Sequence, residues 1–231
     1  MPTVDVSGLR MYYEPHGDGP PVVLILGLGG AVAEFGVLID ALAQHHRVLA
    51  FDNRGVGGTG RPDTPYTIEM MADDTIGLMS AVGFDRAHVI GISMGGRIAL
   101  ALTLRRPEMV DRLVLVSTGA RVIRNVRRRF VMGVLSRIMP GRGPNSQPRS
   151  AFQRQLAASG GWHGTDRLPE ISVPTVILHG RQDRIAQYEL AEELRDGIPG
   201  AKLVTFRGGH MFLMMGERQR FLDEVTAFLA G

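Results

Sequence analysis

The chemistry of this chain centres on Ser93, which occupies the middle of a Gly-Ile-Ser-Met-Gly segment at residues 91–95. The preceding residues 87–90 are typical of a short buried strand, and residues 96–102 are typical of a packed helix. A serine on such a strand-to-helix turn exposes its hydroxyl, while the flanking glycines let strand and helix approach closely. Because a serine hydroxyl is a poor nucleophile at neutral pH, it needs a base within hydrogen-bond reach and an acid that orients this base.

Two later segments offer these partners. Residues 175–180 predict another buried strand, and Asp183 follows in the loop after it. Residues 201–206 predict the next strand, which is followed by His210. Parallel α/β sheets build their sites at the carboxyl ends of the strands, so Ser93, Asp183 and His210 are expected to meet there. We therefore predict Ser93 as nucleophile, His210 as general base and Asp183 as the acid that orients the imidazole.

Two other positions for the acid are weaker. Asp52 lies at the correct edge of the sheet but within a tight turn, and the strand before residue 120 ends in Ser117-Thr118-Gly119, without a carboxylate. Asp183 is therefore the predicted acid.

The chain order serine, aspartate, histidine, each just past a predicted strand, resembles the α/β-hydrolase family rather than other serine-triad folds. The resemblance covers nearly the whole chain, from residue 21 to the last predicted helix near residue 229. It implies one domain over residues 1–231, an α/β-hydrolase fold whose mostly parallel sheet carries helices on both faces. After a hairpin over residues 4–14, the predicted strands are 21–26, 47–51, 87–90, 110–116, 175–180 and 201–206, and the predicted helices are 35–43, 68–82, 96–102, 187–196 and 219–229.

Residues 120–165 interrupt this alternation with two helix-like stretches around a break rich in proline and glycine. The resemblance implies a short helical cap, inserted into a core formed by residues 1–119 and 166–231. The segment contains nine arginines and no acidic residue, so a basic cap covers a net acidic body. Its apolar stripe is expected to face the core or the substrate, and it consists of Val122, Val126, Phe130, Val134 and Ile138. Arginines 127–129 are expected on a solvated helix face, with steering of acidic substrates as the alternative.

Acyl transfer needs backbone N–H donors for the oxyanion of its tetrahedral intermediate. Met94 follows the nucleophile and should donate one from the start of its helix. The resemblance implies that Leu28, in the glycine-rich loop after the strand at 21–26, donates the other. Many relatives begin this loop with His-Gly, where this chain has Leu26-Gly27. The candidate substrate contacts are Gly29, Phe130, Trp162 and Met211.

A Gly-x-Gly-x-x-Gly pattern at residues 55–60 matches a dinucleotide-binding fingerprint. That fingerprint must open a helix directly, and Pro62 and Pro65 oppose a helix at this place. No phosphate-binding or metal-binding motif occurs, so we expect neither cofactor nor metal.

The composition excludes several classes of protein. The 231 residues carry a net charge of +3 and are 44% hydrophobic, as in an ordinary globular domain. The chain has no cysteine, and thus no disulfide, thiolate zinc site or cysteine nucleophile. The sequence shows neither a signal peptide nor an apolar segment long enough to span a membrane, so a cytoplasmic location is expected. Nucleic-acid binding is not expected, and the oligomeric state stays open.

The predicted function is hydrolysis of carboxylic esters with short or medium acyl chains through an acyl-enzyme. Enol-lactone hydrolysis, C–C bond hydrolysis and peroxyacid formation use the same triad and remain alternatives. A ligand-binding receptor on a hydrolase scaffold is a different class, against which the complete triad argues. Epoxide hydrolases and haloalkane dehalogenases would need a carboxylate at position 93.

Overall fold

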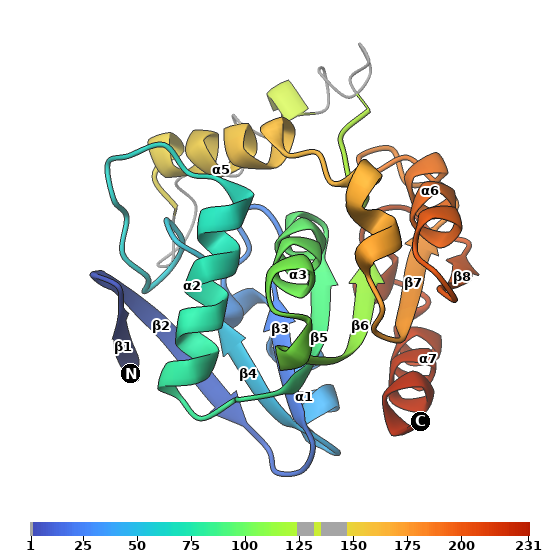
Figure 1. The fold of residues 1–231 in the computed structure, drawn as a ribbon, viewed down its shortest axis with the longest axis horizontal. Coiled ribbons are helices and arrows are strands. Elements are labelled where there is room, and N and C mark those ends of the chain that lie inside the picture. Colours follow the sequence, from blue (N-terminus) through green and yellow to red (C-terminus); the bar gives the residue numbers. More distant parts are fainter. Residues whose placement is uncertain (1, 124–131, 135–146) are drawn as a thin grey trace.

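The centre of the molecule is an eight-stranded sheet in the computed structural model, which describes residues 2–123, 132–134 and 147–231 (Figure 1). The strand order is β1-β2-β4-β3-β5-β6-β7-β8. β2 pairs antiparallel with β1 and β4, and the strands from β4 to β8 pair parallel with their neighbours. The predicted α/β-hydrolase fold with a mostly parallel sheet is confirmed. The strands are β1 (Thr3–Val6), β2 (Leu9–His16), β3 (Pro21–Ile25), β4 (Arg47–Phe51), β5 (Ala87–Ile92), β6 (Val110–Val116), β7 (Thr175–Gly180) and β8 (Lys202–Phe206).

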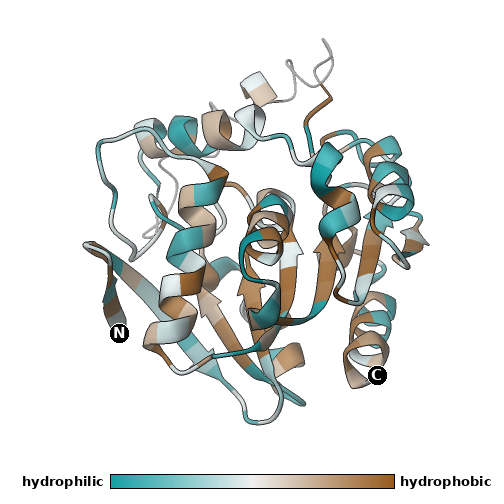
Figure 2. Ribbon diagram, viewed as in Figure 1, coloured by the Kyte–Doolittle hydropathy of each residue, from teal (hydrophilic) through white to brown (hydrophobic). Residues whose placement is uncertain are grey.

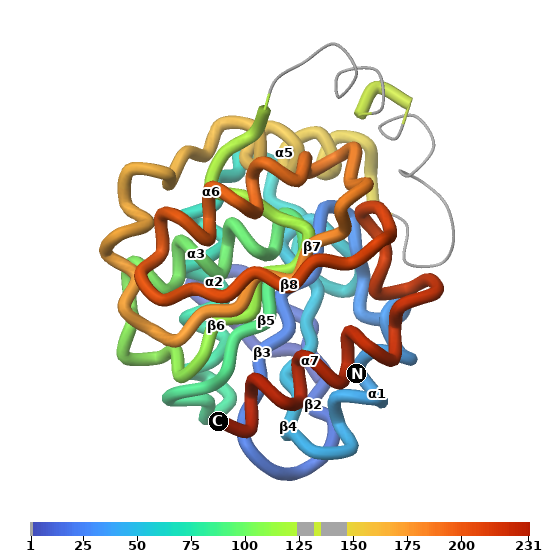
Figure 3. The backbone as a smooth tube through the Cα atoms, turned by 90° about the vertical axis from the view of Figure 1, so that its right-hand side faces the viewer, coloured from blue at the N-terminus to red at the C-terminus, as the bar shows by residue number. Residues whose placement is uncertain are grey.

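Helices cover both faces of this sheet, and two apolar layers result. The layer under α2, α3 and α6 and the layer under α1 and α7 are both closed to solvent. The central strands are therefore continuous apolar runs, as parallel strands buried on both faces require. Figure 2 shows these strands in the colour of hydrophobic residues, and Figure 3 shows α2 and α3 on one side of them and α7 on the other. The α-helices are α1 (Gly36–Ala43), α2 (Ile68–Ala81), α3 (Met94–Arg105), α5 (Arg149–Gly161), α6 (Glu189–Gly197) and α7 (Arg218–Ala230).

The strands and helices expected outside residues 120–165 are present, with shifts of a few residues at their ends. α3 begins at Met94 rather than at residue 96, because the turn after β5 is only one residue long. β2 continues to His16, two residues beyond the expected hairpin, because it pairs with β4 along this stretch. The described part of the chain also contains four short 3₁₀ helices that were not expected: Val32–Glu34, Pro107–Met109, Thr165–Glu170 and Phe212–Met214.

Helix α5 crosses the edge of the sheet at which the parallel strands end (Figure 1). It corresponds to the second helix-like stretch expected between residues 120 and 165. Of the expected apolar stripe, Val122 is buried, but Val134 is 39% exposed, contrary to expectation. Residues 132–134 form a helical turn in which Met132 is buried. Val134 is two positions further along, so it points to the opposite side of the helix and is exposed. Val126, Phe130, Ile138 and arginines 127–129 lie outside the described residues.

Within the described ranges, no helix is both long and apolar enough to cross a membrane.

Candidate active site

Ser93 forms the whole turn between β5 and α3. Its backbone has φ 56° and ψ −115°, a conformation that costs energy for any residue other than glycine. Two hydrogen bonds hold this turn in place: Ser93 N donates to Val116 O at 2.8 Å, and Thr118 Oγ1 donates to Ser93 O at 2.6 Å. The turn is therefore fixed by the end of the neighbouring strand β6, which leaves the hydroxyl of Ser93 directed away from the sheet.

The glycines around Ser93 are required by close backbone contacts. A Cβ atom on Gly95 would lie 2.1 Å from Ile25 O, and one on Gly91 would lie 2.6 Å from Gly95 O. Neither contact can be relieved by turning a side chain, because the atoms approached belong to the backbone. The Gly-x-Ser-x-Gly pattern therefore follows from the packing of β5 and α3 against β3.

A chain of two hydrogen bonds links the three residues that the sequence singled out. His210 Nε2 lies 2.9 Å from Ser93 Oγ, and His210 Nδ1 lies 2.7 Å from Asp183 Oδ2. With Nδ1 as the donor to the carboxylate, Nε2 is left to accept the proton of the hydroxyl. The loops after β5, β7 and β8 thus bring together residues up to 117 positions apart.

The carboxylate of Asp183 is buried, with 6% of the residue exposed, and hydrogen bonds hold both of its oxygens. Oδ2 binds His210, and Oδ1 accepts the amide N–H groups of Ile185 at 2.8 Å and Ala186 at 2.9 Å. His179 is also close, since its Nε2 lies 3.5 Å from Asp183 Oδ2 and 2.8 Å from Ala186 O. Burial lowers the pKa of His179, so this imidazole stays neutral beside the carboxylate.

The loop that carries His210 is tied to the end of β6. Ser117 Oγ donates to His210 O at 2.9 Å, and Ser117 itself has a positive φ of 47°. The hydroxyl of the next residue, Thr118, binds Ser93 O. The end of β6 thus connects the loop that carries His210 with the turn that carries Ser93. The sequence showed only that this strand end lacks a carboxylate, and the positioning role of its two hydroxyls was missed.

The glycine-rich loop after β3 passes directly beside Ser93. A Cβ atom on Gly27 would lie 3.2 Å from Ser93 Cβ. Leu28 and Met94, the two residues expected to donate to the oxyanion, line the same cavity as Ser93. The loop is closed by a hydrogen bond from Gly30 N to Gly27 O at 3.2 Å. The residues Leu28 and Met94 therefore lie at the same cavity as Ser93.

The cavity next to Ser93 is small and enclosed, with a volume of about 30 Å³, which is room for a water molecule or two. Its described lining residues come from the strand ends, from α3 and α5 and from the turn at Met132; they are Leu28, Ser93, Met94, Arg97, Ser117, Met132, Leu156, Ser159, Ile185 and Ala186. A larger, open hollow of about 790 Å³ lies among residues 207–220, where His210 is part of the wall.

The structure places three of the four candidate substrate contacts, and it separates them from one another. Gly29 turns its amide toward α5, and Met211, 39% exposed, lines the larger hollow. Trp162 is buried in the core and packs against Gly164, where a Cβ atom would lie 2.4 Å from the indole. None of these three lines the cavity at Ser93. Phe130 lies outside the described residues.

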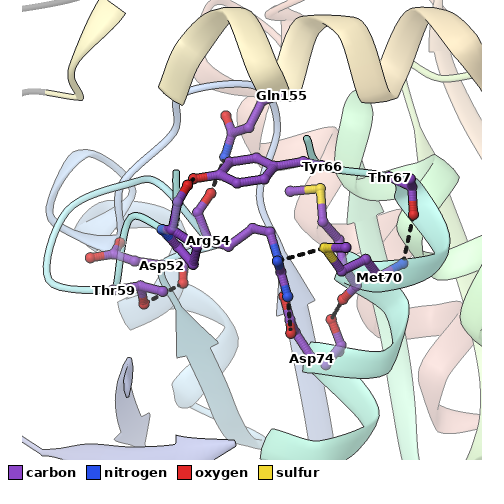
Figure 4. A network of polar contacts seen from close by, with 11 residues as sticks. Asp52, Arg54, Thr59, Tyr66, Thr67, Met70, Asp74 and Gln155 are labelled. Atoms are coloured by element: carbon purple, nitrogen blue, oxygen red, sulfur yellow. Dashed lines mark hydrogen bonds and ion pairs between the residues drawn. The ribbon is translucent and has the colours of Figure 1, made fainter. Parts of the chain in front are cut away.

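A polar network behind the site, drawn in Figure 4, connects α5 with the loops below it. Gln155 is fully buried; its Oε1 accepts from Gly29 N at 3.0 Å, and its Nε2 donates to Arg54 O at 2.8 Å. The guanidinium of Arg54 forms two 2.6 Å hydrogen bonds with Asp74 on α2. Gln155 therefore joins the glycine-rich loop, the loop after β4 and the helix above the site, a role that the sequence did not indicate.

Asp52 belongs to the same region. Its carboxylate accepts the amide of Val32 at 2.8 Å and that of Gly58 at 2.9 Å, and burial raises its pKa. These bonds tie the loop after β4 to the loop after β3. Asp52 is thus engaged in holding two loops together.

The Gly-x-Gly-x-x-Gly segment at residues 55–60 closes on itself, with Gly55 N donating to Gly60 O at 2.9 Å. The next helix, α2, begins only at Ile68. The glycines therefore do not open the helix that follows them in the chain, as the dinucleotide-binding fingerprint requires. Among the described residues there is also no group of three or more His, Asp or Glu side chains placed to hold a metal ion.

The chain belongs to the family of the alpha/beta hydrolase fold, whose model matches residues 20–135. It is 30% identical to the protein named "Putative carbamate hydrolase RutD" of Azorhizobium caulinodans, over 92% of each chain. Its structure is similar to that of the enol-lactonase from Burkholderia xenovorans LB400, with a TM-score of 0.87, 26% identity and all of both chains covered. It is also similar to a meta-cleavage product hydrolase from Pseudomonas fluorescens IP01, with a TM-score of 0.84 and 26% identity, over 100% of this chain and 97% of that one.

Proposed function

We propose that this α/β hydrolase cleaves carboxylic esters of short acyl chains through a covalent acyl-enzyme. Ser93 Oγ attacks the acyl carbon while His210 Nε2 takes its proton. Asp183 holds the imidazole in the required tautomer and stabilises the imidazolium that forms. His210 then returns the proton to the leaving alcohol, and water activated by the same imidazole releases the acid.

The oxyanion of both tetrahedral intermediates would be bound by the amide N–H groups of Leu28 and Met94. The start of α3 adds the positive end of its helix dipole. Every group in this sequence of steps belongs to the chain or to water, and no cofactor takes part.

The observation that carries the proposal is the two-bond chain Ser93–His210–Asp183, built on a strained turn next to an enclosed cavity. A strained non-glycine backbone persists only where its surroundings enforce it, and such sites concentrate where chemistry is done. The small cavity favours the short end of the expected range of acyl groups.

The direct test is covalent labelling with a fluorophosphonate, followed by mass spectrometry of the digested protein. One adduct is expected, on Ser93, and Ser93→Ala should abolish both the adduct and the hydrolysis of 4-nitrophenyl acetate. Ser80→Ala, at an exposed serine of α2, is the matched control and should behave as the wild type. Full hydrolysis by Ser93→Ala would overturn the mechanism.

Carbamate hydrolysis is a second candidate function. It is favoured by the 30% identity, over 92% of the chain, to the protein named "Putative carbamate hydrolase RutD". A carbamate carbonyl would meet the same nucleophile and donors. The test measures rates on alkyl carbamates, on enol-lactones and on substrates of C–C bond hydrolysis, beside rates on acetyl and butyryl esters. The substrate with the highest kcat/KM identifies the reaction. Peroxyacid formation is tested by adding hydrogen peroxide to the ester assay. A binding protein with vestigial turnover would show a single burst and no steady state.

A further inference from the structure

A second histidine lies beside the carboxylate of Asp183. His179 is the last residue but one of β7, and it follows three apolar residues in a strand whose residues are all buried. Its own side chain is completely buried. A buried imidazole costs free energy unless its polar atoms find partners, so the hydrogen bonds of His179 indicate its role.

These hydrogen bonds determine which nitrogen of His179 carries the proton. Nε2 lies 2.8 Å from Ala186 O, and because a carbonyl oxygen can only accept, Nε2 must be the donor. A proton on Nδ1 would find no acceptor within the described part of the chain. Burial also lowers the pKa of His179, which keeps the ring neutral. His179 is therefore a single neutral tautomer whose N–H is directed at the turn after β7.

The N–H of His179 holds the same short turn that holds Asp183. Ala186 accepts from His179 through its carbonyl group and donates to Asp183 Oδ1 through its amide, at 2.9 Å. Asp183 Oδ2 lies 3.5 Å from His179 Nε2 and 2.7 Å from His210 Nδ1. The strand end, the turn and the carboxylate thus form a closed ring of contacts around the oxygen that binds His210.

The sheet sets the position of the His179 imidazole. The ring of Tyr188 meets it edge to face, with centroids 6.0 Å apart and an angle of 84° between the planes. The hydroxyl of Tyr188 is hydrogen-bonded to that of Thr205, the residue of β8 that pairs with His179. The donor that holds the turn therefore belongs to a rigid element, whereas Asp183 and Ala186 belong to a loop.

We propose that His179 is a positioning residue, whose Nε2–H holds the turn at residues 183–186 and so keeps Oδ2 of Asp183 directed at His210. The inference rests on the proposed hydrolysis through Ser93. A carboxylate whose loop is fixed from the sheet stays in place when the imidazole beside it becomes charged. The tautomer and orientation of His210 are thereby kept through both steps of the reaction.

The first test determines the tautomers of both histidines by nitrogen NMR of protein that carries isotopically labelled histidine. At a pH at which histidines are neutral, the nitrogen shifts show which ring nitrogen carries the proton. In the wild type, this should be Nε2 in His179 and Nδ1 in His210. In His179→Leu, His210 should become a mixture of the two tautomers, because Asp183 no longer holds its Nδ1–H. A wild-type His179 protonated at Nδ1, or a His210 that keeps one tautomer in His179→Leu, would overturn the proposal.

The second test is the rate of ester hydrolysis. His179→Leu should lower kcat about 10- to 100-fold with little change in KM, since Asp183 acts on the charged imidazole of the transition state. His179→Gln brings a carboxamide N–H near the position of Nε2 and should restore most of kcat. His179→Asn carries the same group on a shorter side chain and should not restore it. If His179→Leu does not fold, the comparison of these two variants decides, and equal rates in both would overturn the proposal.

His88→Leu is the matched control, because His88 is also a buried histidine of a strand but lies at the opposite end of β5 from Ser93. It should leave kcat and the tautomer of His210 unchanged. A His179→Leu protein that loses stability but keeps the kcat of the wild type would reduce His179 to a packing residue and overturn the proposal. If no ester is hydrolysed, the proposed function fails, whereas the tautomers need no substrate and still decide on His179.

Discussion

The amide N–H of Gly29 donates to Oε1 of Gln155 at 3.0 Å, a hydrogen bond between residues 126 positions apart. It fixes the glycine-rich loop, in which Leu28 directly precedes Gly29, to the helix that crosses the site. The second bond of the same carboxamide, to Arg54 O, fixes the loop after β4. One buried side chain therefore holds the backbone on which the proposed oxyanion donor Leu28 lies.

Replacing Gln155 should impair this donor. In Gln155→Leu, both Gly29 N and Arg54 O lose a buried partner, which should lower the free energy of unfolding by about 1–3 kcal/mol. Because an oxyanion donor acts on the transition state, kcat should fall about 10- to 100-fold with little change in KM. Gln153→Leu is the control, since Gln153 lies on the same helix and is exposed. An unchanged kcat in Gln155→Leu, with only the stability lowered, would show that the loop keeps its geometry without this bond.

The carboxylate of Asp183 should be needed for its charge as well as for its hydrogen bonds. Asp183→Asn can still accept the amides of Ile185 and Ala186, so the loop should stay folded. Its NH₂ group cannot accept from His210 Nδ1, and in the serine proteases the corresponding loss of tautomer control costs about 10⁴ in kcat. Steady-state kinetics on 4-nitrophenyl acetate measure the loss. Asp223→Asn, at a surface carboxylate of α7, serves as control. Full activity in Asp183→Asn would remove Asp183 from the mechanism and leave Asp52 as the next candidate.

Two glycines should respond to alanine in opposite ways. Gly95→Ala places a Cβ atom 2.1 Å from Ile25 O, which should cost at least about 1–3 kcal/mol and displace Ser93 from His210. Gly160 lies within α5 with nothing near the position of its Cβ, so Gly160→Ala should stabilise the protein by about 0.5–1 kcal/mol. Urea denaturation and esterase rates report both effects. Wild-type activity in Gly95→Ala would contradict the close packing of the elbow.

The sequence predicted Ser93, Asp183 and His210 because each follows a strand with a clear apolar pattern, and parallel strands end at one edge of a sheet. Met94 was expected beside the nucleophile because it follows Ser93 in the chain, and Leu28 because of the resemblance to α/β hydrolases; both line the cavity at Ser93. The local pattern accounts for the three residues that follow the strands, but not for Leu28.

Gln155, Ser117 and Thr118 could not be predicted in the same way. The partners of Gln155 lie in two loops more than 100 positions away, and nothing in its helix distinguishes it from the exposed Gln153. Ser117 and Thr118 were considered only as places for a carboxylate, whereas their hydroxyls bind backbone carbonyls of His210 and Ser93. Such roles depend on which loops meet, and only the tertiary structure determines this. The same reason applies to Trp162, whose place at the end of the inserted segment was compatible with a substrate contact or with ordinary packing, and whose indole packs in the core.

Two buried histidines lie side by side at the opposite end of the sheet from Ser93. His46 and His88 lie with ring centroids 6.3 Å apart, and His88 Nδ1 is 3.3 Å from Asp111 Oδ2. Burial lowers the pKa of both, and for His88 this outweighs the attraction of Asp111, with Arg86, Arg112 and His46 adding to the lowering.

The folded protein therefore keeps His88 neutral to a lower pH than the unfolded chain, in which a histidine titrates near 6.5. Unfolding takes up a proton below that pH, so His88 makes the protein less stable as the pH falls from about 7.5 to 5.5. Replacing it with Gln should remove up to about 1.4 kcal/mol per pH unit of this dependence. Urea denaturation at several pH values measures the slope for the wild type, for His88→Gln and for His45→Gln, whose histidine is exposed and serves as the control. If the unfolding free energy of His88→Gln has the same slope against pH as that of the wild type, His88 binds as many protons in the folded as in the unfolded state, and the prediction is wrong.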